Sequence, residues 1–411
     1  MKTKVKTNAL AMTGTFSKSP LAWGFEPNLT VVSAQGCHVE LSDGRLYVDW
    51  VSGLGTNLFG YGYLNDLIIE ELKRGGGSHS LPHQLEYEAA ELITNCLSKH
   101  IPYWNQANLQ ARFCLSGTDA VTMAVRLARV VTGVNKIICA TGGYHGWADW
   151  TISRTSPAAG VPVSVSFDMT EFTFNDLKRL KVWRGGPGSV AAVVIEQGLT
   201  DPEPGFYDGV RDFCDLTGAL FIMDEVVTGL RYGLGGVCGV YDIKPDLVCM
   251  GKALGNGAAV AALVGDEKLM SEFAKISPPF CSSTHWGNSL HMAAAKAVLT
   301  TWRDEYVKYL TFSGEQLMEG FRSAGWGVIG HPPRNLVTFK CLNEQAYFIH
   351  GMREEGVLMN RPNFPTMSHT EEDIDRTIEA ARRARAKYKA SLERGVEMNK
   401  DYLPRVLFSD R

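Results

Sequence analysis

The sequence lacks a strong net charge and long apolar runs, and each absence excludes a class of protein. Its 41 basic and 44 acidic side chains leave a formal net charge of -3, so electrostatics give no reason to expect nucleic acid or an anionic membrane as partner. No uninterrupted apolar run approaches the roughly 18 residues that a membrane helix needs, and no apolar stretch of signal-peptide length follows the basic N-terminus. No membrane partner is therefore expected.

Paired cysteine motifs are also missing. Nine cysteines are present, and no two of them stand in a Cys-x-x-Cys spacing. An odd number of scattered cysteines is typical of a reducing compartment and predicts no zinc site. His79 and His83 could form a metal pair on a helix, but Pro82 between them opposes a helix there. We expect a cytoplasmic protein without a metal centre.

The order of apolar segments predicts an α/β protein of two domains. With 411 residues, of which 45% are hydrophobic, the chain can bury a large core. Strand-like runs alternate with helical patterns, which is typical of a mostly parallel sheet covered by helices. The runs are 112–115, 137–140, 190–195, 220–223, 247–250 and 259–264. We predict a large domain over 57–270 and a smaller domain built from 1–56 and 271–411.

One lysine stands where a short apolar strand meets a glycine-rich turn. Lys252 follows the run 247–250 and has three glycines around it between 251 and 257. Burial of an ammonium group is costly unless the group is paired or used covalently, so Schiff-base formation is the leading use. Asp224 and Glu225 end another apolar run earlier in the chain. Pyridoxal phosphate needs such a pair, an amine for its aldehyde and a carboxylate for its pyridine nitrogen.

Each of these features has another explanation. A lysine after a strand is commonly a surface residue in a turn. The Asp224-Glu225 pair could hold a metal ion in a nucleotide hydrolase, but that function needs a G-x-x-x-x-G-K-[ST] loop, which the sequence lacks. Asp224 could also cap the helix that follows.

Two further segments carry groups that suit an anion and a flat ring. Ser116, Gly117 and Thr118 lie between a strand-like run and a helical pattern, where hydroxyl groups and helix N–H groups favour a phosphate. The same turn is also an ordinary helix N-cap. Tyr144 and His145 follow the run 137–140 in a glycine-rich segment. An aromatic ring there can stack on a heteroaromatic ring, although core packing explains it equally well.

The order and spacing of these motifs resemble the class III, fold-type I pyridoxal-phosphate aminotransferases, and among them the glutamate-1-semialdehyde 2,1-aminomutase branch. The motifs are Ser-Gly-Thr at 116–118, Gly-Tyr-His-Gly at 143–146, Ile-Glu at 195–196, Met-Asp-Glu-Val-Val-Thr-Gly at 223–229, Met-Gly-Lys at 250–252 and Ser-Ser-Thr-His-Trp-Gly-Asn at 282–288. The resemblance covers nearly the whole chain. It implies a large domain with a mostly parallel seven-stranded sheet, a smaller α+β domain from both termini, and a homodimer with shared active sites.

The resemblance also implies a role for each matching residue. The catalytic residues would be Lys252, Asp224 and Glu196. Lys252 would form the internal aldimine with pyridoxal 5'-phosphate and then carry protons, and Asp224 would keep the pyridine nitrogen protonated. Glu196 matches an acidic residue near cofactor and substrate. The cofactor-binding residues would be Ser116, Gly117, Thr118, Tyr144, His145, Asp224, Val226, Lys252 and Thr284.

Within that set the implied contacts differ. The 116–118 turn would hold the phosphate, and Val226 would lie on the ring face opposite Tyr144. His145 would pack or hydrogen-bond beside the ring. Thr284 would reach the phosphate of the neighbouring subunit's cofactor.

Three departures from the aminomutases concern the substrate. The stretch 17–25 lacks the arginine that reads the substrate carboxylate in that branch, Gln197 replaces a proline after Glu196, and the segment 358–367 is shorter. Glutamate-1-semialdehyde is therefore not the expected substrate. Arg361 is a candidate anion reader, because arginine suits bidentate contacts to carboxylate or phosphate, although most arginines are simply solvated.

We therefore expect a homodimeric aminotransferase that moves an amino group from a small-molecule donor to a carbonyl acceptor through a Lys252 aldimine. An aminomutase or a decarboxylase on the same scaffold is the alternative within the family. A metal- or nucleotide-dependent hydrolase that uses Asp224 and Glu225 is the alternative from another class.

Overall fold

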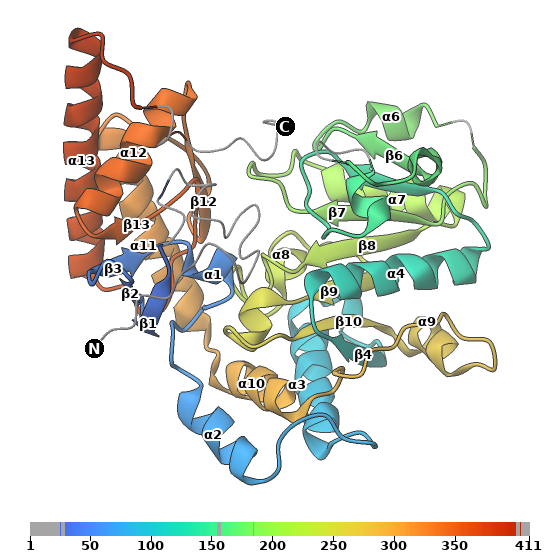
Figure 1. Cartoon of the computed structure of the whole chain (residues 1–411). Helices are drawn as coiled ribbons and strands as arrows, with labels where there is room; N and C mark the ends of the chain where they lie inside the picture. Colours follow the sequence, from blue (N-terminus) through green and yellow to red (C-terminus); the bar gives the residue numbers. More distant parts are fainter. Residues whose placement is uncertain (1–24, 26–28, 154–157, 184, 400–402, 404–411) are drawn as a thin grey trace. The chain divides into compact units, whose positions relative to one another are not determined.

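The computed structural model describes residues 25, 29–153, 158–183, 185–399 and 403. Within these ranges the chain divides into two compact units (Figure 1). The larger unit is Gly53–Thr311, and the smaller unit combines the described residues up to Ser52 with those from Phe312 onward. Every helix in these ranges is too short or too polar to cross a membrane.

A seven-stranded sheet forms the centre of the larger unit. Its order is β4-β10-β9-β8-β7-β5-β6, and β10 runs antiparallel to both of its neighbours while the other pairs are parallel. The predicted mostly parallel seven-stranded sheet is thus confirmed. The strands are β4 Leu109–Cys114, β5 Ile137–Ala140, β6 Met169–Phe172, β7 Ala192–Glu196, β8 Leu220–Glu225, β9 Leu247–Met250 and β10 Ala261–Asp266.

The central strands are buried along their whole length, which explains why the sequence located them. Every residue of β5, β7, β8 and β9 is buried, as expected for a parallel sheet covered on both faces. The edge strand β6 was not predicted. Its middle residues, Thr170 and Glu171, are only half buried, so the segment has no continuous apolar run.

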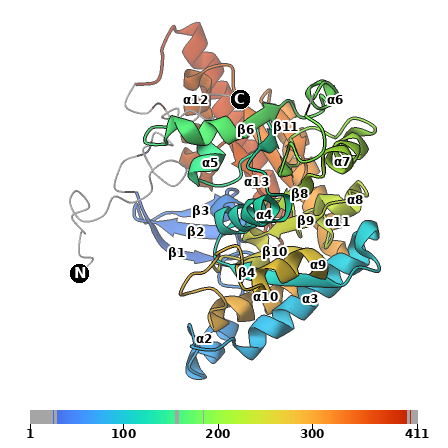
Figure 2. The same cartoon turned by 90° about the vertical axis from the view of Figure 1, so that its right-hand side faces the viewer.

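Helix α4, Gly117–Thr132, lies against β8, β9 and β10 (Figure 2). Its N-terminus is fixed by a capping box. The Ser116 side chain accepts a hydrogen bond from the Asp119 N–H at 3.2 Å, and the Asp119 carboxylate accepts one from the Ser116 N–H at 3.1 Å. The buried face of the helix includes Val121 and Leu127, so sheet packing and the cap together set where α4 begins.

Shorter helices and turns complete the larger unit. The α-helices are α2 Asn65–Lys73, α3 Gln84–His100, α5 Asp149–Ile152, α6 Lys178–Lys181, α7 Phe206–Thr217, α8 Gly236–Val240, α9 Glu267–Met270 and α10 Ser289–Thr301, and the turn α1 Ser52–Gly55 lies at the unit boundary. The 3-10 turns are η3 Pro102–Trp104, η4 Val163–Asp168, η5 Lys252–Gly255 and η6 Ser271–Ala274.

The smaller unit contains two small sheets, one of which has strands from both ends of the chain, and long helices from the C-terminal part. One sheet has the order β1-β2-β3-β13 and the other β11-β12-β14. The strands are β1 Val31–Gln35, β2 His38–Leu41, β3 Leu46–Asp49, β11 Gly327–His331, β12 Arg334–Thr338, β13 Val357–Leu358 and β14 Pro362–Asn363. The helices are α11 Asp304–Ser323, which crosses the unit boundary, α12 Leu342–Glu354 and α13 Glu371–Glu393.

The unit boundaries differ from those predicted at 57 and 270. The sequence assigned the chain after 270 to the smaller domain, because longer helices begin there. In the structure α10 packs on α2, α3 and η5, all of which belong to the larger unit. Residues 271–311 therefore lie in the larger unit, a grouping that depends on contacts between distant segments.

Candidate active site

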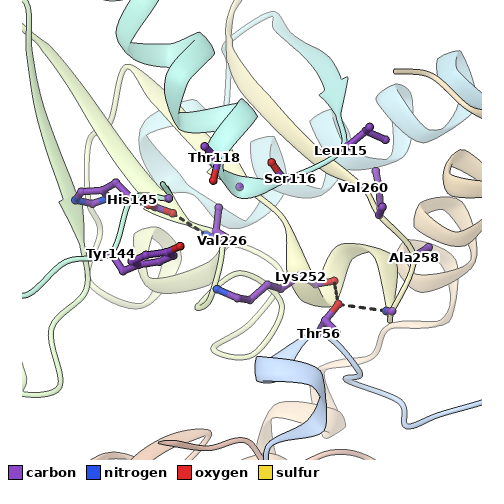
Figure 3. A pocket seen from close by; sticks show the side chains of 15 residues that line it. Thr56, Leu115, Ser116, Thr118, Tyr144, His145, Val226, Lys252, Ala258 and Val260 are labelled. Atoms are coloured by element: carbon purple, nitrogen blue, oxygen red, sulfur yellow. Dashed lines mark hydrogen bonds and ion pairs between the residues drawn. The ribbon is translucent and has the colours of Figure 1, made fainter. Parts of the chain in front are cut away.

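A pocket of about 300 Å³ lies in the larger unit, where β8 and β9 end and α4 begins (Figure 3). Five short segments of the chain line it. They are Thr56, the turn 115–118, the segment 144–146, Asp224 with Val226, and Lys252 with 257–260. The carboxyl ends of parallel strands are the usual location of functional groups in such sheets.

Lys252 follows β9 in a strained backbone conformation. Its φ is +43°, in the left-handed region that costs a non-glycine residue roughly 1–3 kcal/mol and is common at functional sites. The Thr56 hydroxyl holds this conformation, because it donates to the Lys252 carbonyl oxygen at 3.0 Å and accepts from the Gly257 N–H at 3.2 Å. The Lys252 side chain extends into the pocket toward Val226 and Tyr144 (Figure 3).

Asp224 and His145 form a buried pair at the floor of the pocket. His145 Nδ1 lies 2.8 Å from Asp224 Oδ2, and Asp224 Oδ1 accepts the Val226 N–H at 3.1 Å. Since a carboxylate only accepts, His145 Nδ1 carries the proton. Burial alone lowers the pKa of His145, but the hydrogen bond and charge of Asp224, with the charge of Glu196, outweigh it and raise the pKa.

Glu225 faces away from Asp224, because successive side chains of a strand point to opposite sides of the sheet. Its carboxylate accepts hydrogen bonds from the Thr228 hydroxyl and from the Cys238 N–H, the latter at 2.8 Å. Burial raises the pKa of Glu225, although these hydrogen bonds oppose the shift. Among the described residues, neither carboxylate belongs to a cluster of three metal-ligating groups. The arrangement does not support the hydrolase alternative.

The N-terminus of α4 presents an anion-binding end to the pocket. The first intrahelical hydrogen bond joins the Ala120 N–H to the Ser116 carbonyl oxygen at 3.1 Å, so the N–H groups of Gly117 and Thr118 precede it. These groups and the positive end of the helix dipole favour a phosphate. Both alternatives for this turn hold at once, since the Ser116 hydroxyl caps the helix while the turn lines the pocket.

Two glycines allow backbone segments to approach closely here. A Cβ atom on Gly117 would lie 2.7 Å from Val226 Cγ1 and 2.9 Å from Val226 Cγ2. A Cβ atom on Gly146 would lie 2.3 Å from the Thr118 hydroxyl oxygen, and the φ of Gly146 is +99°. The missing side chains bring Val226 and the segment 144–146 directly against the start of α4.

Tyr144 projects into the open part of the pocket and is 57% exposed. Its position depends on Glu196, whose carboxylate accepts the Tyr144 N–H at 2.8 Å. Glu196 pairs with Asp224 in the register of β7 and β8, is 4% exposed, and is not among the residues that line the pocket. Its observed contact therefore orients the Tyr144 segment.

Gln197 stands where the aminomutase sequence pattern has a proline after the acidic residue, and its contacts explain this departure. Its side chain is buried, accepts a hydrogen bond from the Tyr207 hydroxyl and donates one to the Thr200 carbonyl oxygen at 2.8 Å. These hydrogen bonds fix the chain after β7. An amide network thus occupies the place where the family pattern has a proline.

Three other predicted features lie outside the pocket or cannot be placed. Thr284 is exposed, in a turn before α10, and does not line the pocket of its own chain. Arg361 belongs to the smaller unit, where its carbonyl oxygen accepts the Val337 N–H at 2.8 Å. The stretch 17–24 without an arginine lies outside the described residues. Thr56 and the turn 257–260 were missed, because they have no local motif that signals chemistry.

The groups gathered in this pocket fit pyridoxal 5'-phosphate. Lys252 supplies the amine, buried Asp224 the carboxylate, and the start of α4 the anion site, while Tyr144 and Val226 supply surfaces for a flat ring. His145 also lines the pocket, and its bond to Asp224 holds that carboxylate in place. The fold and the site together define a pyridoxal-phosphate enzyme.

Comparison with known proteins identifies the family. Residues 23–324 match the family Aminotransferase class-III, and the chain therefore belongs to the class III aminotransferases. It is 31% identical over 391 residues to the glutamate-1-semialdehyde 2,1-aminomutase of Anaeromyxobacter dehalogenans, covering 86% of this chain and 89% of the relative. The predicted family, enzyme class and cofactor are confirmed.

Solved structures agree with this assignment. The FumI protein of Sphingopyxis sp. MTA144, in its PLP internal aldimine form, is 26% identical with a TM-score of 0.79, over 89% of this chain and 90% of that one. The β-phenylalanine aminotransferase of Variovorax paradoxus is also 26% identical with a TM-score of 0.79, over 91% and 90% of the two chains. The chain is a pyridoxal-phosphate-dependent enzyme with the fold of these two proteins.

Proposed function

We propose that the chain transfers an amino group between two small molecules, an amino donor and a carbonyl acceptor, with Lys252 as its catalytic amine. The observation that carries the proposal is the convergence of Lys252, the Asp224–His145 pair and the start of α4 on one pocket. When bound, pyridoxal phosphate supplies an aldehyde for amino groups and an electron-withdrawing ring.

Each residue of the pocket has a distinct task in this proposal. Lys252 Nζ would hold the cofactor through its aldehyde and would move a proton at the substrate carbon that carries the amino group. Asp224 would hold the pyridine nitrogen of the cofactor, and His145 orients that carboxylate through its Nδ1–H. Glu196 acts as a positioning residue, because its carboxylate holds the backbone of Tyr144.

Two departures from the aminomutase sequence pattern favour transfer between two molecules over an aminomutase reaction. The segment 17–25 has no arginine for the aminomutase substrate's carboxylate, and Gln197 replaces the branch's proline. Arg361 is the residue we propose for reading an acidic group on the substrate. Its planar guanidinium group suits bidentate binding of a carboxylate.

The active enzyme in this proposal is a cytoplasmic homodimer. Thr284 is exposed in the single chain, which leaves its hydroxyl available to the phosphate in a partner subunit's pocket. All nine cysteines are free thiols, which agrees with a reducing compartment.

A half-reaction screen tests the proposed reaction. The cofactor-loaded enzyme is mixed with single amino compounds in the absence of an acceptor, and the loss of the bound cofactor's visible absorption is followed while the products are identified by mass. Intermolecular transfer yields one carbonyl product per active site, with the amino group retained on the enzyme until an acceptor is added. Lys252→Ala is the inactive control. Multiple turnovers to an isomeric amine without any acceptor would instead establish a mutase.

A further inference from the structure

A compact group of a thiol, an imidazole and a carboxylate lies in the smaller unit. Cys37 lies in the tight turn between β1 and β2, His38 is the first residue of β2, and Asp373 lies in the first turn of α13. Cys37 Sγ is 3.5 Å from His38 Nδ1 and 3.3 Å from Asp373 Oδ2, and His38 Nε2 is 3.0 Å from Asp373 Oδ1. Neither the aminotransferase reaction nor its cofactor uses these residues.

The separations within this group match the spacing of ligands around a small metal ion. Ligands at about 2.0–2.3 Å from a tetrahedral zinc ion lie about 3.3–3.8 Å from one another. The three separations, 3.5 Å from Cys37 to His38, 3.3 Å from Cys37 to Asp373 and 3.0 Å from His38 to Asp373, lie near this range. One ligand atom from each residue lies within 4.8 Å of the other two. All three residues can therefore reach one ion once the hydrogen bonds between them give way.

The hydrogen bond between His38 and Asp373 marks the position that the ion would take. A carboxylate only accepts, so His38 Nε2 carries the proton in this bond and the lone pair of the neutral ring is on Nδ1. An ion in place of that proton binds Nε2 and Asp373 Oδ1 together, and the proton of the neutral ring moves to Nδ1.

Burial protects the thiol while leaving a route for the ion. Cys37 is 2% exposed and the Asp373 side chain 8%, whereas 33% of the His38 side chain is exposed. The opening beside His38 gives access to the ion and to a water molecule as fourth ligand. Asp373 Oδ2 also accepts hydrogen bonds from the Thr370 N–H at 2.9 Å and from its hydroxyl at 2.8 Å, which hold the carboxylate in place.

We propose that Cys37 Sγ, His38 Nε2 and Asp373 Oδ1 bind one divalent transition-metal ion of borderline softness, with Zn²⁺ as the expected ion and water as the fourth ligand. Binding replaces the proton of the Cys37 thiol by the metal and releases that proton to solvent, so the affinity rises with pH. The ion joins the β1–β2 turn to the start of α13. Zinc accepts this mixture of sulfur, nitrogen and oxygen ligands.

Cobalt binding provides a direct test. The full-length, cofactor-loaded protein is treated with a chelator, dialysed and titrated with Co²⁺, and the d–d absorption bands are followed at wavelengths beyond those of the cofactor. We expect one Co²⁺ per chain, with the intense bands of a four-coordinate site, and displacement by one equivalent of Zn²⁺. Metal analysis of the dialysed protein gives the stoichiometry independently.

Cys37→Ser and His38→Asn remove one ligand each. Each should weaken binding by more than the 10–100-fold that loss of an outer-shell partner typically costs. Cys96→Ser is the matched control, because the Cys96 thiol also donates a hydrogen bond, to the Leu234 carbonyl oxygen, and is outside the cluster. It should bind Co²⁺ like the unaltered chain. Asp373→Asn is avoided, because Asp373 also caps α13.

Two outcomes would overturn the metal site. One is the absence of the cobalt bands at millimolar Co²⁺ in the unaltered chain, which would leave the three residues as a hydrogen-bonded cluster only. The other is binding that persists equally in Cys37→Ser and His38→Asn, which would place the ion on surface histidines. Circular dichroism of each variant confirms that it is folded. If one variant fails to fold, the other still decides the question.

Discussion

The contact between Gly117 and Val226 predicts a specific and reversible defect. In Gly117→Ala the new methyl group would lie 2.7 and 2.9 Å from the two Cγ atoms of Val226, closer than real Cβ atoms come to other groups. Valine has few alternative rotamers, so the methyl groups cannot simply rotate away. Either the start of α4 or the Val226 backbone must shift. Both line the pocket, so cofactor binding should weaken as well.

The expected size of the defect follows from overpacking. Extra methyl groups in a well-packed site cost about 1–3 kcal/mol. For a unit of this size each kcal/mol lowers the thermal midpoint by about 2–4 °C, so Gly117→Ala should lower it by about 2–12 °C. Gly186→Ala is the control, because no atom lies within 4 Å of the Cβ position there. It should change the midpoint little.

A double variant separates the clash from other effects. Val226→Ala removes both Cγ atoms and by itself costs roughly 1.5 kcal/mol in lost apolar burial. Adding Gly117→Ala to it should cost little more, because the space is now free. Calorimetry measures the midpoints, and a cofactor titration followed by absorbance measures the affinity. If the losses in thermal midpoint and cofactor affinity simply added in the double variant, the contact between residue 117 and Val226 would not be their cause.

Four further predictions concern the chemistry of the site. Lys252→Ala should lower turnover by several orders of magnitude, and near-normal activity with a borohydride-reducible linkage at another lysine would contradict its role. Asp224→Asn should reduce the rate far more than the stability, whereas Glu225→Gln should mainly lower the thermal midpoint, because Glu225 faces other partners; equal rate losses would count against this division. The raised pKa of His145 means that its bond to Asp224 stabilises the fold fully below about pH 6.5, and that this contribution is lost as pH rises through the raised pKa. The difference in thermal unfolding midpoint between the unaltered chain and His145→Asn should therefore shrink with rising pH. A difference that does not change with pH would contradict a stabilising bond between His145 and Asp224. Thr284→Ala should weaken cofactor binding, measured by an absorbance titration, while sedimentation shows that the variant is still a dimer. An unaltered chain that sediments as a monomer and is fully active would rule out a site shared between subunits.

Local patterns were sufficient for the central sheet and for naming the candidate residues of the site. The strands β5 and β9 have the predicted limits, because their continuous apolar runs fit a sheet buried on both faces. Lys252 and Asp224 were found because charged residues at the ends of such runs are costly without a use. The capping box at the start of α4 is likewise formed by residues close together in the sequence, Ser116 and Asp119.

The sequence by itself thus determined the fold class and the family, and it singled out the candidate residues of the site, since each depends on residues near one another in the chain. Only the tertiary structure decided which groups meet. The bond from His145 to Asp224, the contact of Glu196 with the Tyr144 backbone and the cluster of Cys37 with Asp373 join residues 79, 52 and 336 positions apart. No local pattern encodes such pairs, because they arise from the packing of separate strands and helices, where distance in space is independent of distance along the chain.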